Sequence, residues 1–366
     1  MQMDFSLPND TCRLASQLLS SPVLRFVEAL AFAANCGSSL LNLGLFACLI
    51  SVPTAFHTHL KALLASGALL NSLHLASKAT QQAMNGANAL AHLRAGAGNC
   101  RVMEERRCCL SVCSSVTAGM ITIFFFFALA TERLWATAAY ATYEGRQSIV
   151  FAVVSWLLSI ALYSQKLLEQ LESERPVHYC SSHSVFSSPE EGVASSFLVI
   201  IGNVGLSGLL LAIFGRANFV NRRLRLLKQL PGERLASRYQ VQENIRTTES
   251  IGRMLLCLFL CTSFAQLAYL AAKMGWIHAL AQNDEARVEA AIEFASLGYA
   301  AYGVCFVYYC ARGSAQLRGR AAKLLPRRVA ALLCRRGASV TPANDDEEGK
   351  NAETKRHFAT LADAWK

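Results

Sequence analysis

The chain has 366 residues, of which 53% are hydrophobic and only 16% are charged, and its formal net charge is +10. A soluble domain usually carries about 25% charged residues, so this composition excludes an ordinary soluble protein and favours one that spans a membrane. The positive charge is explained by surfaces that face anionic lipid, and it gives no reason to expect a nucleic-acid partner.

Uncharged stretches long enough to cross a membrane recur along the chain. A transmembrane helix needs about 20 predominantly apolar residues. Five such stretches carry no formal charge, and two less regular ones precede them, the first broken by Pro53 and the second interrupted by Lys78. The predicted spans are 24–52, 62–84, 107–131, 148–168, 193–215, 254–273 and 290–311. The expected fold class is all-α, a polytopic membrane protein with a bundle of seven transmembrane helices.

The distribution of lysine and arginine between the loops predicts the orientation. The loop between the fifth and sixth spans is strongly basic, and residues 312–336 hold eight basic residues and no acid, whereas the loop after the fourth span has five glutamates and one arginine. Basic loops stay in the cytoplasm, so residues 1–23 are expected outside the cell. One predicted outer loop departs from this trend, with Arg94, Arg101, Arg106 and Arg107.

The N-terminal segment carries a glycosylation signal. Asn9 begins an Asn-Asp-Thr triplet, which is an acceptor in the secretory pathway and fits an outer location. We expect no cleaved signal peptide, because no positively charged stretch followed by a short apolar run and a small-residue cleavage site is found near residue 1, and the first span is expected to act as its own signal.

The third span runs from Cys108 on the outer side to Glu132 and Arg133 on the cytoplasmic side. At about 1.5 Å per residue, the stretch from Cys108 to Arg133 covers roughly 37 Å, enough to cross the membrane. The charged pair has two interpretations. It is either the ordinary polar end of a membrane helix, or it has a role of its own at the cytoplasmic face.

The acidic loop after the fourth span contains a single cysteine, Cys180, in an oxidising compartment. A bridge from Cys108 to Cys180 would hold this loop over the mouth of the bundle, although Cys100 and Cys109 compete for the same partner. The cysteines within spans are expected to be small packing residues. A cysteine at the top of the third helix, a cysteine in the second outer loop and an acid-arginine pair at the third helix's base resemble the pattern of G protein-coupled receptors.

A second motif, "ERLASRYQVQENIRTTE", leads into the sixth span. It resembles the corresponding segment of nematode serpentine chemoreceptors of the Sra superfamily (the Sra, Srab, Srb and Sre families). The matching positions are Leu235, Arg238, Tyr239, Gln240, Glu243 and Asn244. The end of the third span, "ERLWATAAYATYEG", resembles the same group through Glu132, Arg133, Ala136, Thr137, Tyr143 and Glu144.

This resemblance implies a chemosensory receptor in the plasma membrane of a nematode sensory neuron, in its cilium, that binds a small external molecule and couples to a heterotrimeric G protein. We expect the ligand to shift the population between two packings of the bundle. The residues expected to carry coupling are Glu132, Arg133, Tyr143, Arg238, Tyr239, Gln240, Glu243 and Asn244. Glu132 is expected to hold Arg133 in the resting form as an exposed pair, worth only about 0–1 kcal/mol.

Polar groups within spans usually face the interior of a bundle, which gives candidates for a ligand pocket. They are Glu28, Lys78, Gln266, Tyr269 and Glu293. For Lys78 and Glu293 the alternative is that the side chain simply reaches the lipid headgroups.

The segment after the seventh span combines leucines with abundant arginine. Residues 312–336 are therefore expected to form an amphipathic helix on the inner leaflet, with Cys334 as a candidate for palmitoylation. Residues 337–366 are polar and expected to be a disordered cytoplasmic tail.

The sequence gives no support for an enzyme or for a cofactor. It contains no nucleophile elbow, no His-Glu-x-x-His and no phosphate loop, and His57 with His59 is too small a set for a metal site. A small-solute transporter or a non-signalling membrane adaptor is the alternative. Seven spans without an evident internal repeat argue against a transporter.

Overall fold

The computed structural model describes the chain in several stretches. These are residues 16–52, 58–95, 103–104, 108, 122, 125–137, 153–154, 156–157, 160–161, 164, 176–177, 179–180, 193–227, 235–274, 284–314, 317 and 319. They fall almost entirely in a compact unit that ends at Leu317. The predicted segments 312–336 and 337–366, with Cys334, lie largely or wholly outside the described residues, as do Asn9, Tyr143, Cys100 and Cys109.

Five long helices dominate the described residues. They are α2 (Pro22–Ser51), α3 (Thr58–Ala95), α7 (Val193–Leu227), α8 (Leu235–Lys273) and α10 (Glu285–Gly313). Residues 125–137 form a further helical stretch. Two short strands, β1 (Met103–Glu104) and β2 (Pro176–Val177), pair antiparallel, with Met103 opposite Val177.

Local sequence sets where two of these helices begin and end. Ser21 caps α2 by accepting a hydrogen bond from the amide of Leu24, and Pro22 occupies the first helical position, where its missing N–H costs nothing. The helix ends at Ser51, and Val52, which precedes a proline in the sequence, is extended. Asp284 caps α10 through the amide of Ala286 at 3.0 Å.

Around an apolar core that includes Leu64, Phe125 and Phe306, the helices also expose many apolar side chains and bury several polar ones, unlike a soluble bundle. On α2, Phe26 and Leu40 are 70% and 69% exposed, whereas Asn35 and Asn42 are 1% and 0% exposed. In the described part of the chain, four helical segments are long and apolar enough to cross a membrane: Pro22–Ser51, Val204–Arg223, Asn244–Ala272 and Glu285–Gly313.

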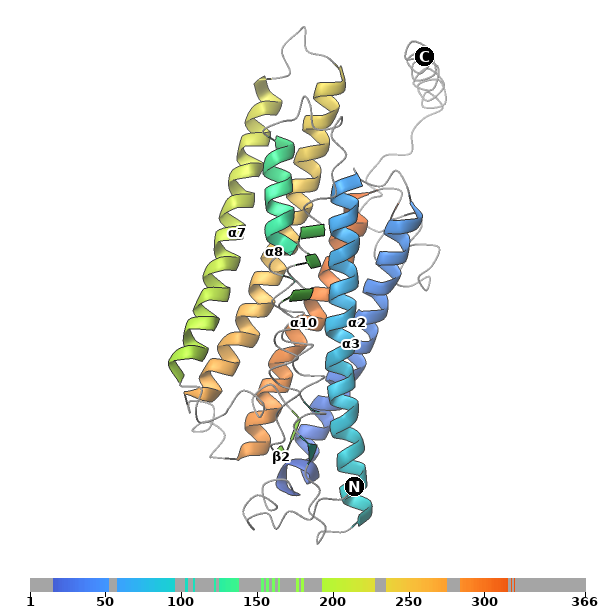
Figure 1. The fold of residues 1–366 in the computed structure, drawn as a ribbon, viewed down its shortest axis with the longest axis vertical. Coiled ribbons are helices and arrows are strands. Elements are labelled where there is room, and N and C mark those ends of the chain that lie inside the picture. The colour runs from blue at the N-terminus through green and yellow to red at the C-terminus, as the bar shows by residue number, and fades with distance from the viewer. Residues whose placement is uncertain are drawn as a thin grey trace, which may run out of the picture. The chain divides into compact units, whose positions relative to one another are not determined.

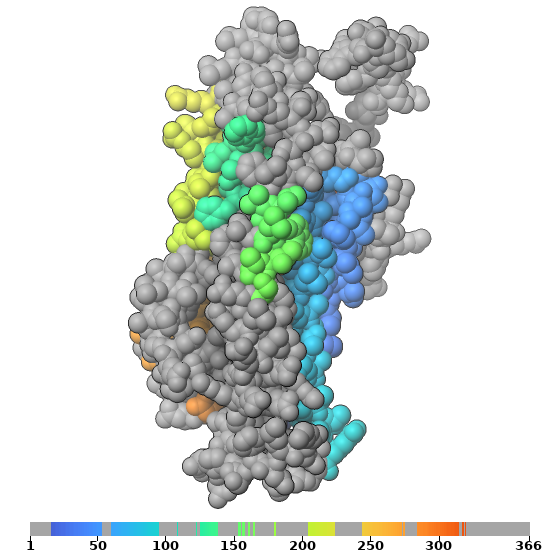
Figure 2. Space-filling view, viewed as in Figure 1, coloured from blue at the N-terminus to red at the C-terminus, as the bar shows by residue number. Residues whose placement is uncertain are grey.

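Helix α10 lies between its neighbours and packs against α2, α3 and α8, while α7 packs against α8 (Figure 1). Ser38 Oγ donates to the carbonyl oxygen of Ala300 at 2.9 Å, and Asn42 Nδ2 donates to that of Gly303 at 3.2 Å. The described residues between 153 and 164 lie on the surface beside α3 (Figure 2), where Trp156 Nε1 donates to Ser66 Oγ at 2.9 Å. Hydrogen bonds between helices therefore contribute to holding the bundle together.

Candidate functional site

The two ends of the bundle each hold a buried polar cluster. We call the end that contains Cys108 and Cys180 the disulfide end, and the opposite end the Arg133 end.

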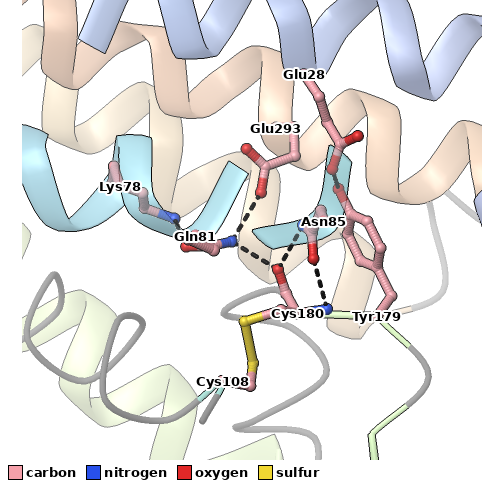
Figure 3. The surroundings of a disulfide bond; sticks show 8 residues. All are labelled: Glu28, Lys78, Gln81, Asn85, Cys108, Tyr179, Cys180 and Glu293. Atoms are coloured by element: carbon pink, nitrogen blue, oxygen red, sulfur yellow. Dashed lines mark hydrogen bonds between the residues drawn. A yellow bond between two sulfur atoms is a disulfide. The ribbon is translucent and has the colours of Figure 1, made fainter. Parts of the chain in front are cut away.

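At the disulfide end, a bond joins Cys108 to Cys180, with 5.3 Å between their Cα atoms (Figure 3). The backbone of Cys180 is also fixed to α3. Asn85 Nδ2 donates to the Cys180 carbonyl oxygen at 2.9 Å, Asn85 Oδ1 accepts from the Cys180 amide at 3.2 Å, and Gln81 Nε2 donates to the same carbonyl at 2.8 Å. Residues 179–180 are thus tied both to Cys108 and to α3.

Glu293 of α10 is 1% exposed and is held by amides from α3. Its Oε1 accepts from Gln81 Nε2 at 3.2 Å and its Oε2 from Gln82 Nε2 at 3.1 Å. Asn35 of α2 extends the network by donating from Nδ2 to Gln82 Oε1 at 3.1 Å. Three helices therefore meet around one buried carboxylate.

Lys78 joins the same network from α3. Its Nζ donates to Gln81 Oε1 at 3.1 Å, so one glutamine side chain links an ammonium to the Glu293 carboxylate (Figure 3). Both Lys78 and Glu293 are buried rather than extended toward the surface. The two charges are kept inside the bundle by hydrogen bonds that offset part of their desolvation cost.

Glu28 of α2 forms a second acidic centre at this end. It pairs with Arg25 and accepts a hydrogen bond from the hydroxyl of Tyr179. Burial, followed by the nearby carboxylates of Glu293 and Glu28, raises the pKa of Tyr179 well above its usual value, so the hydroxyl remains protonated and can donate. The Arg25 guanidinium lies 5.8 Å from the centre of the Tyr179 ring.

Gln266 and Tyr269, the remaining candidates for a ligand pocket, lie on α8 and are half-buried. The Oε1 atom of Gln266 is buried and has no hydrogen-bond partner in the described structure.

At the Arg133 end, Glu132 and Arg133 form a pair that is 1% and 2% exposed. The expectation of an exposed pair is therefore wrong. The pair is buried because α8 packs against it: Arg133 NH1 donates to Thr247 Oγ1 at 2.9 Å, and Asn244 Nδ2 donates to the carbonyl oxygen of Ala136 at 3.1 Å. We call these four side chains and the Ala136 carbonyl the Arg133 junction.

Contacts between α7 and α8 lie beside the junction. Asn221 Nδ2 donates to Thr248 Oγ1 at 3.4 Å, and Glu249 pairs with Arg222 and Arg253, each at 3.2 Å. The charged pairs are solvent-exposed and contribute little to stability.

The structure brings together some of the predicted residues and leaves others undescribed. Glu132, Arg133 and Asn244 meet in the junction, and Lys78 and Glu293 share one network. The side chains of Arg238, Tyr239, Gln240 and Glu243 lie outside the described residues.

Sequence reasoning missed the uncharged members of both clusters. They are Asn35, Gln81, Gln82, Asn85, Tyr179 and Thr247. A signal for three of them was present, because Asn35 lies within the predicted span 24–52 and Gln81 and Gln82 lie within 62–84. The same rule that selected charged residues within spans would have found these amides.

Residues 9–331 match the family model described as "Serpentine type 7TM GPCR receptor class ab chemoreceptor". The chain belongs to this family. This class ab chemoreceptor is accordingly an all-α, multi-pass membrane protein with a seven-transmembrane bundle, and the prediction of an Sra-superfamily receptor is confirmed. The family is a class of chemoreceptors rather than of enzymes. No curated protein matches the chain.

Proposed function

We propose that this class ab chemoreceptor binds a small molecule outside the cell and activates a heterotrimeric G protein inside it, by rearranging the ends of its helices. It would act in the plasma membrane of a sensory neuron's cilium. Its N-terminus would lie outside, so the disulfide end is the outer end and the Arg133 end is cytoplasmic. The basic connection between α7 and α8 supports this orientation, since basic loops are retained in the cytoplasm.

The observation that carries the proposal is the buried contact of Arg133 with α8. The guanidinium donates to Glu132 and to Thr247, so its hydrogen-bonding groups are engaged within the bundle. An arginine held in this way is not available to a protein partner. The structure therefore has the properties expected of a resting form, with α8 packed against residues 125–137.

Activation would separate α8 from residues 125–137. A ligand can shift this equilibrium only if it binds the separated form more tightly. Once the junction opens, Arg133 and Asn244 would be exposed together with Tyr143 and the segment of Arg238, Tyr239, Gln240 and Glu243. This surface would receive the G protein.

The ligand would bind among the polar residues of the outer end. The candidates are Glu28, Lys78, Gln266, Tyr269 and Glu293. Cys180 is bonded to Cys108, and Gln81 donates to both the Cys180 carbonyl and Glu293 of α10. A ligand that displaced Gln81 would therefore change the contacts of residues 179–180 and of α10 at once.

The test is a G-protein dissociation assay in cells that display equal amounts of receptor at the surface. Arg133→Ala and Tyr239→Ala should each lower basal or ligand-raised dissociation about tenfold, which corresponds to roughly 1.4 kcal/mol. Arg287→Ala is the matched control, because Arg287 is an exposed arginine at the opposite end whose ion-pair partner among the described residues is Asp284. Equal dissociation by wild type and both variants would contradict the proposal that Arg133 and Tyr239 belong to the surface that binds the G protein.

A further inference from the structure

The outward face of α7 changes from apolar to basic toward the Arg133 end. Six exposed residues recur along the helix at intervals of four and three, which places them on one face. They are Gly205, Leu209, Ala212, Arg216, Phe219 and Arg223. The buried residues of the same stretch, which lie on the opposite face, are Ser207, Leu210, Phe214, Ala217 and Asn221. We call Arg216, Phe219 and Arg223 the α7 basic stripe.

The two arginines of the stripe carry charge that no described carboxylate neutralises. Within the described residues, neither Arg216 nor Arg223 forms an ion pair. Arg222, the neighbour of Arg223 in sequence, differs in this respect. It is turned about 100° around the helix and pairs with Glu249 of α8 at 3.2 Å. Two positive charges of α7 are therefore available to a partner on its outward face.

Arg223 points back along α7 rather than away from the bundle. Its guanidinium carbon lies 5.9 Å from the centre of the Phe219 ring, which is one turn nearer the middle of the helix. Side chains tilt toward the N-terminus of their helix, and a guanidinium beside an aromatic ring is held there by cation–π attraction. Arg216 lies one turn beyond Phe219 in the same direction. The two arginines thus flank one exposed ring.

The level of the stripe along α7 corresponds to the headgroup layer of a bilayer. Arg216 directly follows the predicted span 193–215, which is uncharged, and Phe219 is about 4.5 Å further along the helix. The headgroup layer is about 5–7 Å thick on each side of the hydrocarbon. Arginine donates two parallel hydrogen bonds to a phosphate, which makes it well suited to binding a phosphate at this level.

The position of the stripe on the side of the bundle favours a lipid over a protein partner. Helix α7 lies at the edge of the bundle (Figure 1), and its outward face continues from the stripe into Leu209 and Ala212. Leu209 is 52% exposed and Phe219 is 56% exposed. A phospholipid combines an anionic headgroup with apolar chains, in the same order as the basic and apolar residues along this face. A G protein would instead approach the end of the bundle, where the Arg133 junction opens.

We propose that the α7 basic stripe is a binding site for an acidic phospholipid of the inner leaflet. The phosphate lies between the guanidinium groups of Arg216 and Arg223, and the acyl chains lie along Leu209 and Ala212. The site depends on the orientation proposed above, with the Arg133 end cytoplasmic, because acidic lipids are concentrated in the cytoplasmic leaflet. It requires neither the chemosensory ligand nor the G protein.

The test titrates the purified full-length receptor, in a neutral detergent, with short-chain phosphatidylserine, short-chain phosphatidylcholine and inorganic phosphate. A lipid that binds the folded receptor raises its thermal unfolding midpoint. We expect phosphatidylserine to raise the midpoint at lower concentrations than phosphatidylcholine does, and inorganic phosphate to leave it unchanged. Arg216→Gln and Arg223→Gln should each weaken the apparent affinity for phosphatidylserine about fivefold, the effect expected for one arginine beside acidic lipid.

Arg222→Gln is the matched control. It removes the same charge from the position next to Arg223, but Arg222 lies on the flank of α7 that meets α8 and is paired with Glu249. Its affinity for phosphatidylserine should equal that of wild type. The midpoint without lipid reports whether each variant is folded, and either of the two stripe variants is sufficient for the comparison with Arg222→Gln.

Three results would overturn the proposal. Phosphatidylcholine or inorganic phosphate could act like phosphatidylserine, Arg222→Gln could weaken binding as much as Arg223→Gln, or both stripe variants could bind like wild type. In the last case, lower G-protein dissociation by Arg216→Gln and Arg223→Gln at equal surface display would assign the stripe to the G protein instead. Because lipid binding is measured without a G protein, selective phosphatidylserine binding by a receptor that never dissociates one would leave this site standing and remove the proposed function.

Discussion

Among the described residues, Glu132 and Thr247 bind Arg133 with unequal importance. Glu132 neutralises its charge, whereas Thr247 contributes one hydrogen bond from another helix. Removing Glu132 would leave a buried cation without a counter-charge, at a cost of about 3–5 kcal/mol. Removing the Thr247 hydroxyl costs a charge-assisted hydrogen bond, about 1.5–3 kcal/mol, and the bond that it donates to the Asn244 carbonyl of its own helix. Thr247 is therefore the residue at which the contact between helices can be weakened without unfolding the bundle.

We expect Thr247→Val to raise basal G-protein dissociation roughly tenfold, because losing about 1.5 kcal/mol from the closed junction shifts the equilibrium toward the open form. The measurement is basal dissociation at equal surface expression. Thr262→Val is the control, since Thr262 is buried on the same helix and, in the described part of the chain, its hydroxyl bonds to carbonyl oxygens of that helix alone. A basal signal that stays unchanged or falls would show that this bond does not restrain the receptor.

Helix α10 approaches its neighbours closely where glycine removes the side chain. A Cβ atom on Gly303 would lie 2.3 Å from Ser38 Oγ and 2.9 Å from Leu75 Cδ1. Small residues at such contacts allow membrane helices to pack by van der Waals contact and by hydrogen bonds between backbones and side chains. The close approach at Gly303 also brings its carbonyl oxygen within reach of Asn42.

Gly303→Ala should destabilise the bundle by about 1–3 kcal/mol, because the added methyl group overlaps Ser38 Oγ. The thermal unfolding midpoint in nanodiscs measures this loss. Adding Ser38→Ala should restore part of it, since that change removes the overlapping oxygen atom. Gly208→Ala serves as the control, because nothing lies within 4 Å of a Cβ atom at that position. Equal midpoints for the two single variants would contradict the packing described.

The bundle is held by an apolar core, by polar contacts between its helices and by a disulfide at one end. The disulfide joins residues 72 apart in sequence, and it lies beside the network that connects α2, α3 and α10. A crosslink over such a distance limits the unfolded chain more than the folded one. It should therefore contribute to the stability of the entire bundle.

Cys180→Ser should lower the free energy of unfolding by about 2–4 kcal/mol. The effect should appear as a lower thermal midpoint without reducing agent, and reducing agent should lower the wild-type midpoint in the same way. Cys36→Ser should behave like wild type, because Cys36 is a free, half-buried cysteine of α2. A Cys180→Ser variant as stable as wild type would show that the bridge contributes nothing to folding.

The fold was predictable from sequence because the membrane imposes a one-dimensional rule: long uncharged stretches have to become spanning helices. The clusters were not, because their members are remote in sequence. Arg133 and Thr247 are 114 residues apart, and Gln82 and Glu293 are 211 apart. For the same reason the sequence left Cys100, Cys108 and Cys109 as alternatives, and it suggested an exposed charge pair where packing against α8 buries one.

The most direct test of the proposed mechanism is to lock the Arg133 junction. A receptor with Ala136→Cys and Asn244→Cys carries a thiol on each of two residues that are in contact, since Asn244 Nδ2 lies 3.1 Å from the Ala136 carbonyl oxygen. Mild oxidation should crosslink them, and each single variant controls for the native cysteines. We expect the crosslinked receptor to leave the G protein undissociated and reduction to restore dissociation. Equal dissociation from crosslinked and reduced receptor would contradict the claim that α8 separates from residues 125–137 during signalling.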